Sequence, residues 1–382
     1  MHPFTGVLIA LVIAAPWHIL ATLRNPPFAY FALSANGGQY HGFFWFYFFN
    51  EHILRFLNTR FPRDYNTVPR PLFWIFHLLW LFPWSVFFPA AFRALRKGLG
   101  KDRAGRTRIL ALCWIGFVMV FFTFSTTQEY YSLPIYPALA LLIGGALANE
   151  DRWVTAGRRV LASVATLCAL AIAAILFAVH GIPTPGDISN ALTQNPDLYT
   201  LSLGHMGDLT LKSFAYLRLP LVLAGIAFAI GAAANWMWKN MRANIATAVM
   251  MVLFLQAARV AMVAFDPYLA SRPLAEALEA SPPGRLILDD QYYTWSSVIF
   301  YTNRRALLLN GRVNNLEYGS NDPTAPQDVF IGDTDLKRLW PSADRYYLLV
   351  EGPAVKRIQG IVGDTALKVV RESGGKFLFT NH

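Results

Sequence analysis

Long apolar runs separated by short polar stretches fill residues 1–264 of this sequence. A helix needs about 20 apolar residues to cross the hydrocarbon core of a bilayer. The runs that qualify lie at residues 4–22, 72–92, 108–124, 131–148, 160–180, 214–234 and 244–264. Charged residues make up only 15% of the 382-residue chain, against roughly 25% in soluble domains. The pattern predicts a polytopic α-helical membrane protein with about seven transmembrane helices.

The third and fourth runs are separated by only a few residues, so they could form one broken helix. Gln128 and Glu129 lie between them. Charged side chains are costly at the centre of a bilayer. We therefore expect two helices joined by a tight turn.

Basic residues are concentrated in alternate loops between these runs. The loop between the second and third runs has a single acid, Asp102, and its basic residues are Arg93, Arg96, Lys97, Lys101, Arg103, Arg106 and Arg108. Basic residues recur at 152–159 and at 239–242, whereas residues 181–213 contain only Lys212. Lysine and arginine mark cytoplasmic loops. The N-terminus is therefore expected in the cytoplasm and the C-terminal part outside. The net charge of +10 is explained by this orientation, without a nucleic-acid partner.

Residues 265–382 have the composition of a soluble domain. Asp266-Pro267 is expected to end the last apolar helix, and a short helix should follow at 271–280. The stretches RLILDD, RALLLN and RYYLLVE predict strands, YYTWSSVIFYT fits a helix or a strand, and ALKVVRES with KFLFTN predicts a hairpin around Gly374-Gly375. We predict a small α/β extracytoplasmic domain at 265–382 beside a transmembrane bundle at 1–264.

The connection between the first two runs, residues 23–71, is too polar to span a membrane and too apolar for a free loop. This balance is typical of helices that lie in the membrane interface. Within GFFWFYFFNEHILRFLNTR, the polar residues Glu51, His52 and Arg55 share one face at helical spacing. The opposite face is aromatic, as in the belts at membrane surfaces.

Arginines at the depth of lipid phosphates can bind a phosphate through two parallel hydrogen bonds. The candidates on this segment are Arg55, Arg60 and Arg63, with Glu51 beside them. Each has an ordinary alternative. Arg60 and Arg63 could anchor the helix to anionic head groups, Arg55 could simply pair with Glu51 one turn earlier, and His52 could be structural.

Three stretches of this region, PWHILATLRNPPFAYFALSANGG, FFNEHILRFL and FPRDYNTVPRPLFW, resemble the interfacial helices of family 39 glycosyltransferases and the chain before them. That superfamily includes protein O-mannosyltransferases and the aminoarabinose transferases that modify lipid A. FSTTQEYYSLPIYPALALLIG is similar to a second signature of the bacterial members, and the resemblance covers essentially the whole chain. It implies a GT-C fold and a bacterial plasma (inner) membrane enzyme that moves a sugar from a polyprenyl-phosphate donor to a lipid, glycan or protein acceptor.

The resemblance also implies roles for single residues. Arg55 would be a cation that absorbs the charge of the departing phosphate. His52 would correspond to a residue associated with a divalent metal in some members, which is the only cofactor expected. Tyr131 matches a family tyrosine, and Thr127 stands where the aminoarabinose transferases have a lysine. Glu129 in the same turn is a further substrate-binding candidate, although a solvated turn is an equal alternative.

The sequence begins about midway through the family pattern. The spans that carry the family's catalytic aspartate are therefore expected on a missing N-terminal part or on a separate chain, and the sequence itself offers no catalytic residue. The chain could also be an inactive fragment, or a non-enzymatic membrane protein such as a transporter or a lipid-binding subunit. Transporters usually carry charged or Gly/Pro-broken residues at mid-span. Here such ionisable residues are few, notably His77 and Arg259, which favours the transferase.

Overall fold

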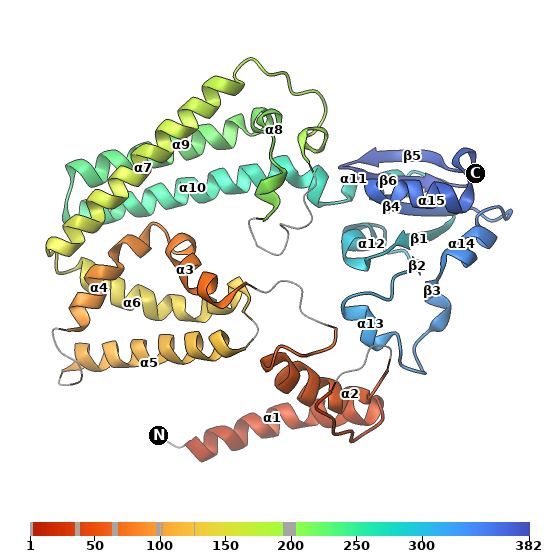
Figure 1. Cartoon of the computed structure of the whole chain (residues 1–382), viewed down its shortest axis with the longest axis horizontal. Helices are drawn as coiled ribbons and strands as arrows, with labels where there is room; N and C mark the ends of the chain where they lie inside the picture. The colour runs from red at the N-terminus through yellow and green to blue at the C-terminus, as the bar shows by residue number, and fades with distance from the viewer. Residues whose placement is uncertain are drawn as a thin grey trace.

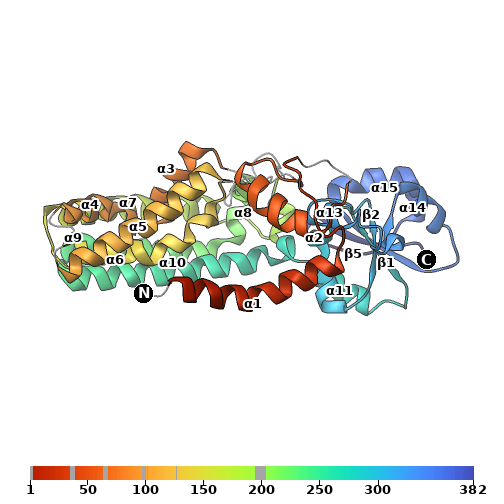
Figure 2. The same cartoon turned by 90° about the horizontal axis from the view of Figure 1, so that it is seen from below.

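The computed structural model describes residues 3–34, 39–62, 68–96, 100, 102–125, 127–193 and 204–382. Among these residues, six helices are long and apolar enough to cross a membrane, or seven if one bent pair forms a single span. The six are α1 (Pro3–Arg24), α5 (Arg103–Phe124), η3 (Glu129–Ile135) continued by α6 (Tyr136–Leu147), α7 (Arg152–Val179), α9 (Arg218–Met237) and α10 (Asn240–Leu269). The predicted polytopic helical fold is confirmed. Figures 1 and 2 show the long helices at one end of an elongated molecule and a sheet domain at the other.

Small side chains let the last three long helices pack closely. α9 lies against both α7 and α10 (Figure 1). A Cβ atom at Gly231 would come within 2.0 Å of the Met250 sulfur, and Asn235 on α9 donates a hydrogen bond of 3.0 Å to the hydroxyl of Thr247 on α10. In lipid, helices associate through close backbone approach and hydrogen bonds of this kind, because moving apolar side chains out of lipid gains little.

The second predicted run, residues 72–92, is not one straight helix. α3 (Arg70–Trp80) ends, and the chain bends by 98° into η2 (Trp84–Phe87) and α4 (Phe88–Leu95). Pro83 lies in the break, and proline cannot donate the backbone hydrogen bond that continues a helix. By contrast, α5 and α6 are separate helices joined through η3, which confirms the turn predicted between the third and fourth runs.

The expected end of the last apolar helix at Asp266-Pro267 is wrong, because α10 continues to Leu269. Proline removes one backbone donor from a helix. Pro267 lies in the final turn of α10, where the loss affects one bond and leaves the preceding turns intact. The N–H of Ala270 donates to the carbonyl of Asp266 at 2.7 Å and closes that last turn.

The C-terminal domain contains a six-stranded sheet with the order β3-β2-β1-β4-β6-β5. The strands are β1 (Arg285–Asp289), β2 (Ala306–Leu309), β3 (Phe330–Ile331), β4 (Tyr346–Glu351), β5 (Lys368–Ser373) and β6 (Lys376–Thr380). The first four in spatial order are parallel, and β6 and β5 form an antiparallel hairpin beside β4. The predicted strands and hairpin are confirmed. Residues 292–302 are helical, in η7 (Tyr292–Trp295) and α12 (Ser296–Thr302).

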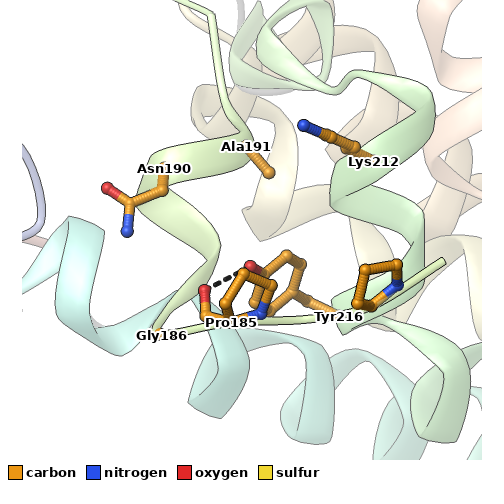
Figure 3. Close-up of a pocket in the computed structure, with 7 residues that line it drawn as sticks. Pro185, Gly186, Asn190, Ala191, Lys212 and Tyr216 are labelled. Carbon is orange, nitrogen blue, oxygen red and sulfur yellow. Dashed lines mark hydrogen bonds between the residues drawn. The ribbon is translucent and has the colours of Figure 1, made fainter.

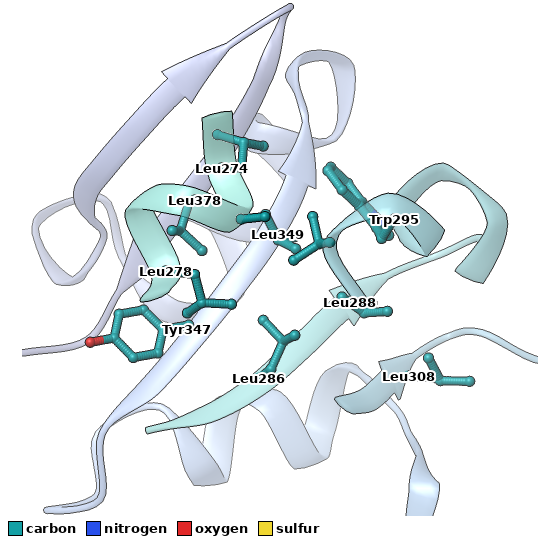
Figure 4. Close-up of a cluster of buried hydrophobic side chains, with 11 residues drawn as sticks. Leu274, Leu278, Leu286, Leu288, Trp295, Leu308, Tyr347, Leu349 and Leu378 are labelled. Atoms are coloured by element: carbon teal, nitrogen blue, oxygen red, sulfur yellow. The ribbon is translucent and has the colours of Figure 1, made fainter. Parts of the chain in front are cut away.

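Helices cover both faces of this sheet. α11 (Arg272–Glu279) and α12 cover one face, where Leu274, Leu278 and Trp295 pack onto Leu286 and Leu349 (Figure 4). α14 (Asp333–Leu339) and α15 (Val355–Val362) cover the other. Successive side chains of β1 and β4 point to opposite faces of the sheet, and both faces are covered by helices. These strands are therefore continuous apolar runs rather than alternating apolar and polar residues.

The β5–β6 hairpin is attached to the end of α10. The buried Lys376 Nζ lies 3.4 Å from the Ser271 hydroxyl and 3.5 Å from the Leu269 carbonyl oxygen. Burial lowers the pKa of Lys376, and the negative charge of Glu351 opposes that shift. Gly374 sits so close to α10 that a Cβ atom there would lie 1.8 Å from the carbonyl oxygen of Pro267.

Replacing Gly374 with alanine should therefore destabilise the protein more than replacing Gly375. Both glycines have left-handed backbones, with φ of +63° and +71°, so both variants carry strain of roughly 1–2 kcal/mol. Only at Gly374 does the new methyl group also collide with Pro267, since nothing lies within 4 Å of a Cβ at Gly375. Thermal unfolding followed by circular dichroism measures the difference. Equal midpoints for the two variants would contradict the contact between hairpin and α10.

Candidate functional site

The segment that carries most of the predicted site residues is helical, as expected. α2 (Gly42–Phe44) leads into η1 (Trp45–Leu54), and helical turns continue to Phe56. η1 is a π-helix, a form the sequence did not indicate. In a π-helix the backbone hydrogen bonds join residues five positions apart, and such segments occur often at functional sites. The Nδ1 atom of His52 lies 2.5 Å from the carbonyl oxygen of Tyr47, five residues earlier.

Glu51 holds two arginines on one side of this helix. Its Oε2 accepts a hydrogen bond from Arg55 Nη1 at 2.9 Å, and its Oε1 accepts one from Arg60 Nη1 at 2.6 Å. The Glu51 and Arg60 side chains are 19% and 12% exposed, and that of Arg55 is 30% exposed. The Glu51–Arg55 ion pair that was the alternative for Arg55 is thus present, and the same carboxylate brings a second guanidinium, that of Arg60, into a half-buried setting.

Arg55 also contacts a second part of the chain. Its guanidinium carbon lies 6.0 Å from the centre of the Tyr131 ring, which belongs to η3. Tyr131 in turn packs against Phe122 of α5, with ring centres 4.7 Å apart. A cation over an aromatic face is attracted by the ring's electron density, more strongly where water is excluded. η1 and the α5–η3 turn therefore meet at Arg55.

A pocket of about 740 Å³ opens where these segments meet. Glu51, His52, Arg55 and Tyr131 give it a polar end, whereas Phe56, Leu57, Phe121 and Phe122 form an apolar wall. Phe56 and Phe121 pack with ring centres 5.3 Å apart. Sequence reasoning missed this wall, because its halves are separated by more than sixty residues and no local pattern links them. A pocket with an arginine at its polar end and an aromatic wall suits an amphipathic ligand with an anionic head.

Four predicted residues, Glu51, His52, Arg55 and Tyr131, line this single pocket. Arg60 joins them through Glu51. Arg63 lies outside the described residues. The backbone of Glu129 begins η3, but its side chain is outside the described part of the structure, so its role stays a prediction.

The metal predicted for His52 finds no partner ligands in the described part of the chain. No group of three or more His, Cys, Asp or Glu side chains there is placed to hold an ion. His52 directs Nδ1 at a backbone carbonyl, which leaves only Nε2 as a ligand. The residues present do not form a metal site by themselves.

The turn between α5 and η3 is buried at its start. Thr127 and Gln128 are 5% and 7% exposed. The Thr127 hydroxyl donates to the Val68 carbonyl, and the Val68 N–H donates back to the Thr127 carbonyl at 2.8 Å. Thr127 thus ties the start of α3 to the turn that presents Tyr131, whereas Tyr130 is exposed.

The C-terminal domain fixes the start of η1. The hydroxyl of Tyr318, in α13 (Asn315–Gly319), accepts a hydrogen bond from the His41 N–H at 2.9 Å and donates one to the Gly42 carbonyl at 3.0 Å. Its ring stacks on Phe46 with centres 4.4 Å apart. Burial raises the pKa of Tyr318 to about 12, so the hydroxyl keeps its proton and remains a donor at neutral pH. The pocket residues follow two turns later along η1.

A second cavity, of about 370 Å³, lies between η4 (Ile188–Ala191) and α8 (Leu211–Tyr216) (Figure 3). The Tyr216 hydroxyl donates to the Pro185 carbonyl at 2.7 Å across its floor. Lys212 is the one charged residue among those that line it, and this side chain is exposed. With a single solvated charge, this cavity is a poorer candidate than the pocket beside η1.

Comparison with known proteins agrees with the motifs. No family model matches the chain. The sequence is 28% identical over 179 residues to the undecaprenyl phosphate-alpha-4-amino-4-deoxy-L-arabinose arabinosyl transferase of Pectobacterium carotovorum, which covers 44% of this chain and 28% of that protein. It is 30% identical over 142 residues to the transferase of the same name from Aeromonas hydrophila, covering 36% and 22%.

The chain also resembles solved structures over almost its whole length. ArnT from Cupriavidus metallidurans bound to undecaprenyl phosphate superposes with a TM-score of 0.67 and 19% identity, covering 99% of this chain and 60% of that one. The apo structure gives a TM-score of 0.65. The fold is therefore that of ArnT, and the predicted resemblance to aminoarabinose transferases is confirmed. The chain spans well under a third of the curated relatives it matches and 60% of the ArnT structures.

Proposed function

We propose that this chain, which has the fold of ArnT, is the C-terminal part of a membrane glycosyltransferase whose donor is a sugar on a polyprenyl phosphate. The observation that carries this proposal is the pocket beside η1. The guanidinium of Arg55, with that of Arg60 joined to it through Glu51, can donate hydrogen bonds to the phosphate, and the aromatic wall offers an apolar surface to the isoprenoid chain. The sugar passes to a lipid, glycan or protein acceptor.

In this transfer, the bond between the sugar's anomeric carbon and the phosphate oxygen breaks, and a bond to the acceptor oxygen forms. The phosphate leaves with negative charge, which the guanidiniums of Arg55 and Arg60 offset. Such preorganised charges act most strongly where water is excluded. Glu51 orients both arginines, and the Tyr131 ring also contacts Arg55. The acceptor proton goes to a base that we assign to no residue of this chain; by resemblance it is an aspartate of a part outside it.

α1 supports the proposal that further membrane segments complete the enzyme. The apolar window of this helix has no buried residue, and it stands apart from α5–α10 in Figure 1. Spans from another part of the same protein, or from a separate chain, would cover it together with membrane lipid. A photoreactive side chain at Val12, which is 65% exposed, should crosslink to such a segment. Crosslinks to lipid alone would contradict this arrangement.

We also propose that the protein lies in a bacterial plasma membrane with its C-terminal domain outside. The alternation of basic loops supports this orientation. Two exposed positions on opposite sides of the bundle test it: a cysteine at Lys337 should react with a membrane-impermeant maleimide in spheroplasts, and a cysteine at Arg103 only after lysis. The native Cys113 and Cys168 are replaced by alanine for this measurement. The reverse pattern would invert the orientation.

Ligand binding tests the donor assignment directly. The purified chain in detergent should bind polyprenyl phosphate at least tenfold more tightly than the matching polyprenol, because only the phosphate engages the arginines. Isothermal titration calorimetry measures both affinities. Equal affinities would leave the pocket an unspecific apolar surface and remove the main support for a lipid-phosphate donor. Transfer assays with defined polyprenyl-phosphate sugars then identify the sugar and the acceptor.

A further inference from the structure

A separate group of arginines lies at the amino-terminal edge of the parallel strands in the C-terminal domain. β6 begins at Lys376, which contacts Leu269 at the end of α10. β4 runs antiparallel to β6 and parallel to β1, whose neighbour β2 runs the same way. The carboxyl ends of β1, β2 and β4 therefore lie on the side of α10, and their amino ends lie on the far side of the sheet.

A groove of about 710 Å³ runs along this far edge. Its charged lining residues are Arg285, Arg304, Arg305 and Asp328, and Leu307 and Val329 add apolar surface. The arginines outnumber the acid, so the groove carries a net positive charge of two. Neither of the two cavities described above is lined by as many arginines.

Two of these arginines are neighbours across the sheet. Leu286 pairs with Ala306 in the register of β1 and β2, so Arg285 and Arg305 occupy the preceding pair of positions. Adjacent residues on paired strands point to the same face, and like charges placed directly opposite are unfavourable. Within the described residues, neither Arg285 nor Arg305 forms an ion pair. Arg304 donates only to the backbone carbonyl of Leu278, at 3.3 Å.

At the opposite edge of the same strands, an arginine is paired with two carboxylates. Arg357 reaches Asp289 at the end of β1, and it donates to Asp333 at 2.8 Å. Burial raises the pKa of Asp289, while the charge of Arg357 opposes the rise. One edge thus pairs its arginine with two carboxylates, whereas the groove at the far edge has three guanidiniums and the single carboxylate of Asp328.

We propose that this groove binds a phosphate-bearing anion from the aqueous side. Guanidinium forks match the oxygens of phosphate, and one phosphate can accept hydrogen bonds from several of them. The groove faces away from the end of α10, so phospholipid head groups of the host membrane are not the source. A soluble phosphate compound, or a phosphate on a polymer outside the membrane, fits the position. This inference is independent of the proposed glycosyl transfer.

The test uses the complete chain in detergent and inorganic pyrophosphate as the probe. Calorimetry at constant ionic strength should show saturable binding, and Arg285→Ala and Arg305→Ala should each weaken it at least tenfold. Arg338→Ala is the matched control, because it removes the same charge from an exposed helix of the same domain, where Arg338 pairs with Asp335. Circular dichroism verifies that each variant folds.

Three outcomes would overturn the proposal. The first is no saturable binding of pyrophosphate to the unaltered chain. The second is an equal loss in Arg338→Ala, which would indicate a general charge effect. The third is binding of a short-chain phosphatidylglycerol through Arg285 and Arg305 without binding of pyrophosphate, which would make a lipid head group the ligand. Polyprenyl-phosphate affinity should be unchanged in all these variants.

Discussion

Replacing Arg55 with alanine lowers the affinity of the chain for polyprenyl phosphate by about tenfold or more. A hydrogen bond to a charged group contributes about 1.5–3 kcal/mol, and 1.4 kcal/mol corresponds to a factor of ten in affinity. Arg55 is 30% exposed, so solvent screening places the loss at the lower end of that range. Affinity for the uncharged polyprenol should stay the same, because its contacts are with the apolar wall.

Arg272 provides a closely matched control for this experiment. It pairs with Glu276 four residues later at 2.8 Å and lies 5.6 Å from the Tyr301 ring, much as Arg55 pairs with Glu51 and contacts Tyr131. Arg272→Ala should leave polyprenyl-phosphate affinity unchanged. Arg55→Lys keeps the charge without the planar fork and should fall between the wild type and Arg55→Ala. Unchanged affinity in Arg55→Ala would reduce this residue to a partner of Glu51.

Tyr318→Ala should release the start of η1 from the C-terminal domain and destabilise the protein by about 3 kcal/mol, the usual cost of deleting a buried aromatic side chain. Tyr318→Phe keeps the stack on Phe46 and removes only the hydroxyl, so its cost should be about 1 kcal/mol for each hydrogen bond lost. Hydrogen exchange of the amides in residues 42–54 measures the release, and thermal unfolding measures the stability.

Tyr293→Ala controls for the loss of a tyrosine from the same domain, because its side chain is 52% exposed and its removal should cost little. The affinity for polyprenyl phosphate shows whether Tyr318 positions the pocket residues of η1 or only stabilises the fold. It should fall in Tyr318→Ala at temperatures where the chain is still folded, and recover in Tyr318→Phe. If exchange in residues 42–54 is as slow in Tyr318→Ala as in the wild type, the domain does not hold this segment.

Much of the fold follows from short-range information in the sequence. The long apolar runs located the membrane helices, and alternating charge in the loops predicted their orientation. The continuous apolar stretches around Leu286 and Leu348 located the central strands. β3 escaped notice because it has only two residues, too few for any periodicity. The bend between α3 and α4 had a signal in Pro83, but the surrounding apolar residues were consistent with an unbroken span.

The site was predictable only in part, for a similar reason. Glu51 and Arg55 are four residues apart, so their pairing follows from helical spacing. The approach of Arg55 to Tyr131 and of Tyr318 to His41 depends on chain segments brought together by the fold. The spacing of residues in the sequence also did not indicate the π-helical form of η1. Local spacing named most of the polar residues, and tertiary contacts decided which of them share a pocket.

In the part of the chain that the structure describes, the C-terminal domain is held at two separated points. Its hairpin rests on Pro267 at the end of α10, and Tyr318 is hydrogen-bonded to His41 and Gly42 ahead of η1. Two fixed points on a rigid body define an axis, and the motion they leave is rotation about that line. A swing of the domain would therefore move its arginine-lined edge through an arc, while the backbone of His41 and Gly42, ahead of the pocket beside η1, stays near the axis. A ligand bound at the far edge could therefore move with the domain while the pocket beside η1 keeps its place.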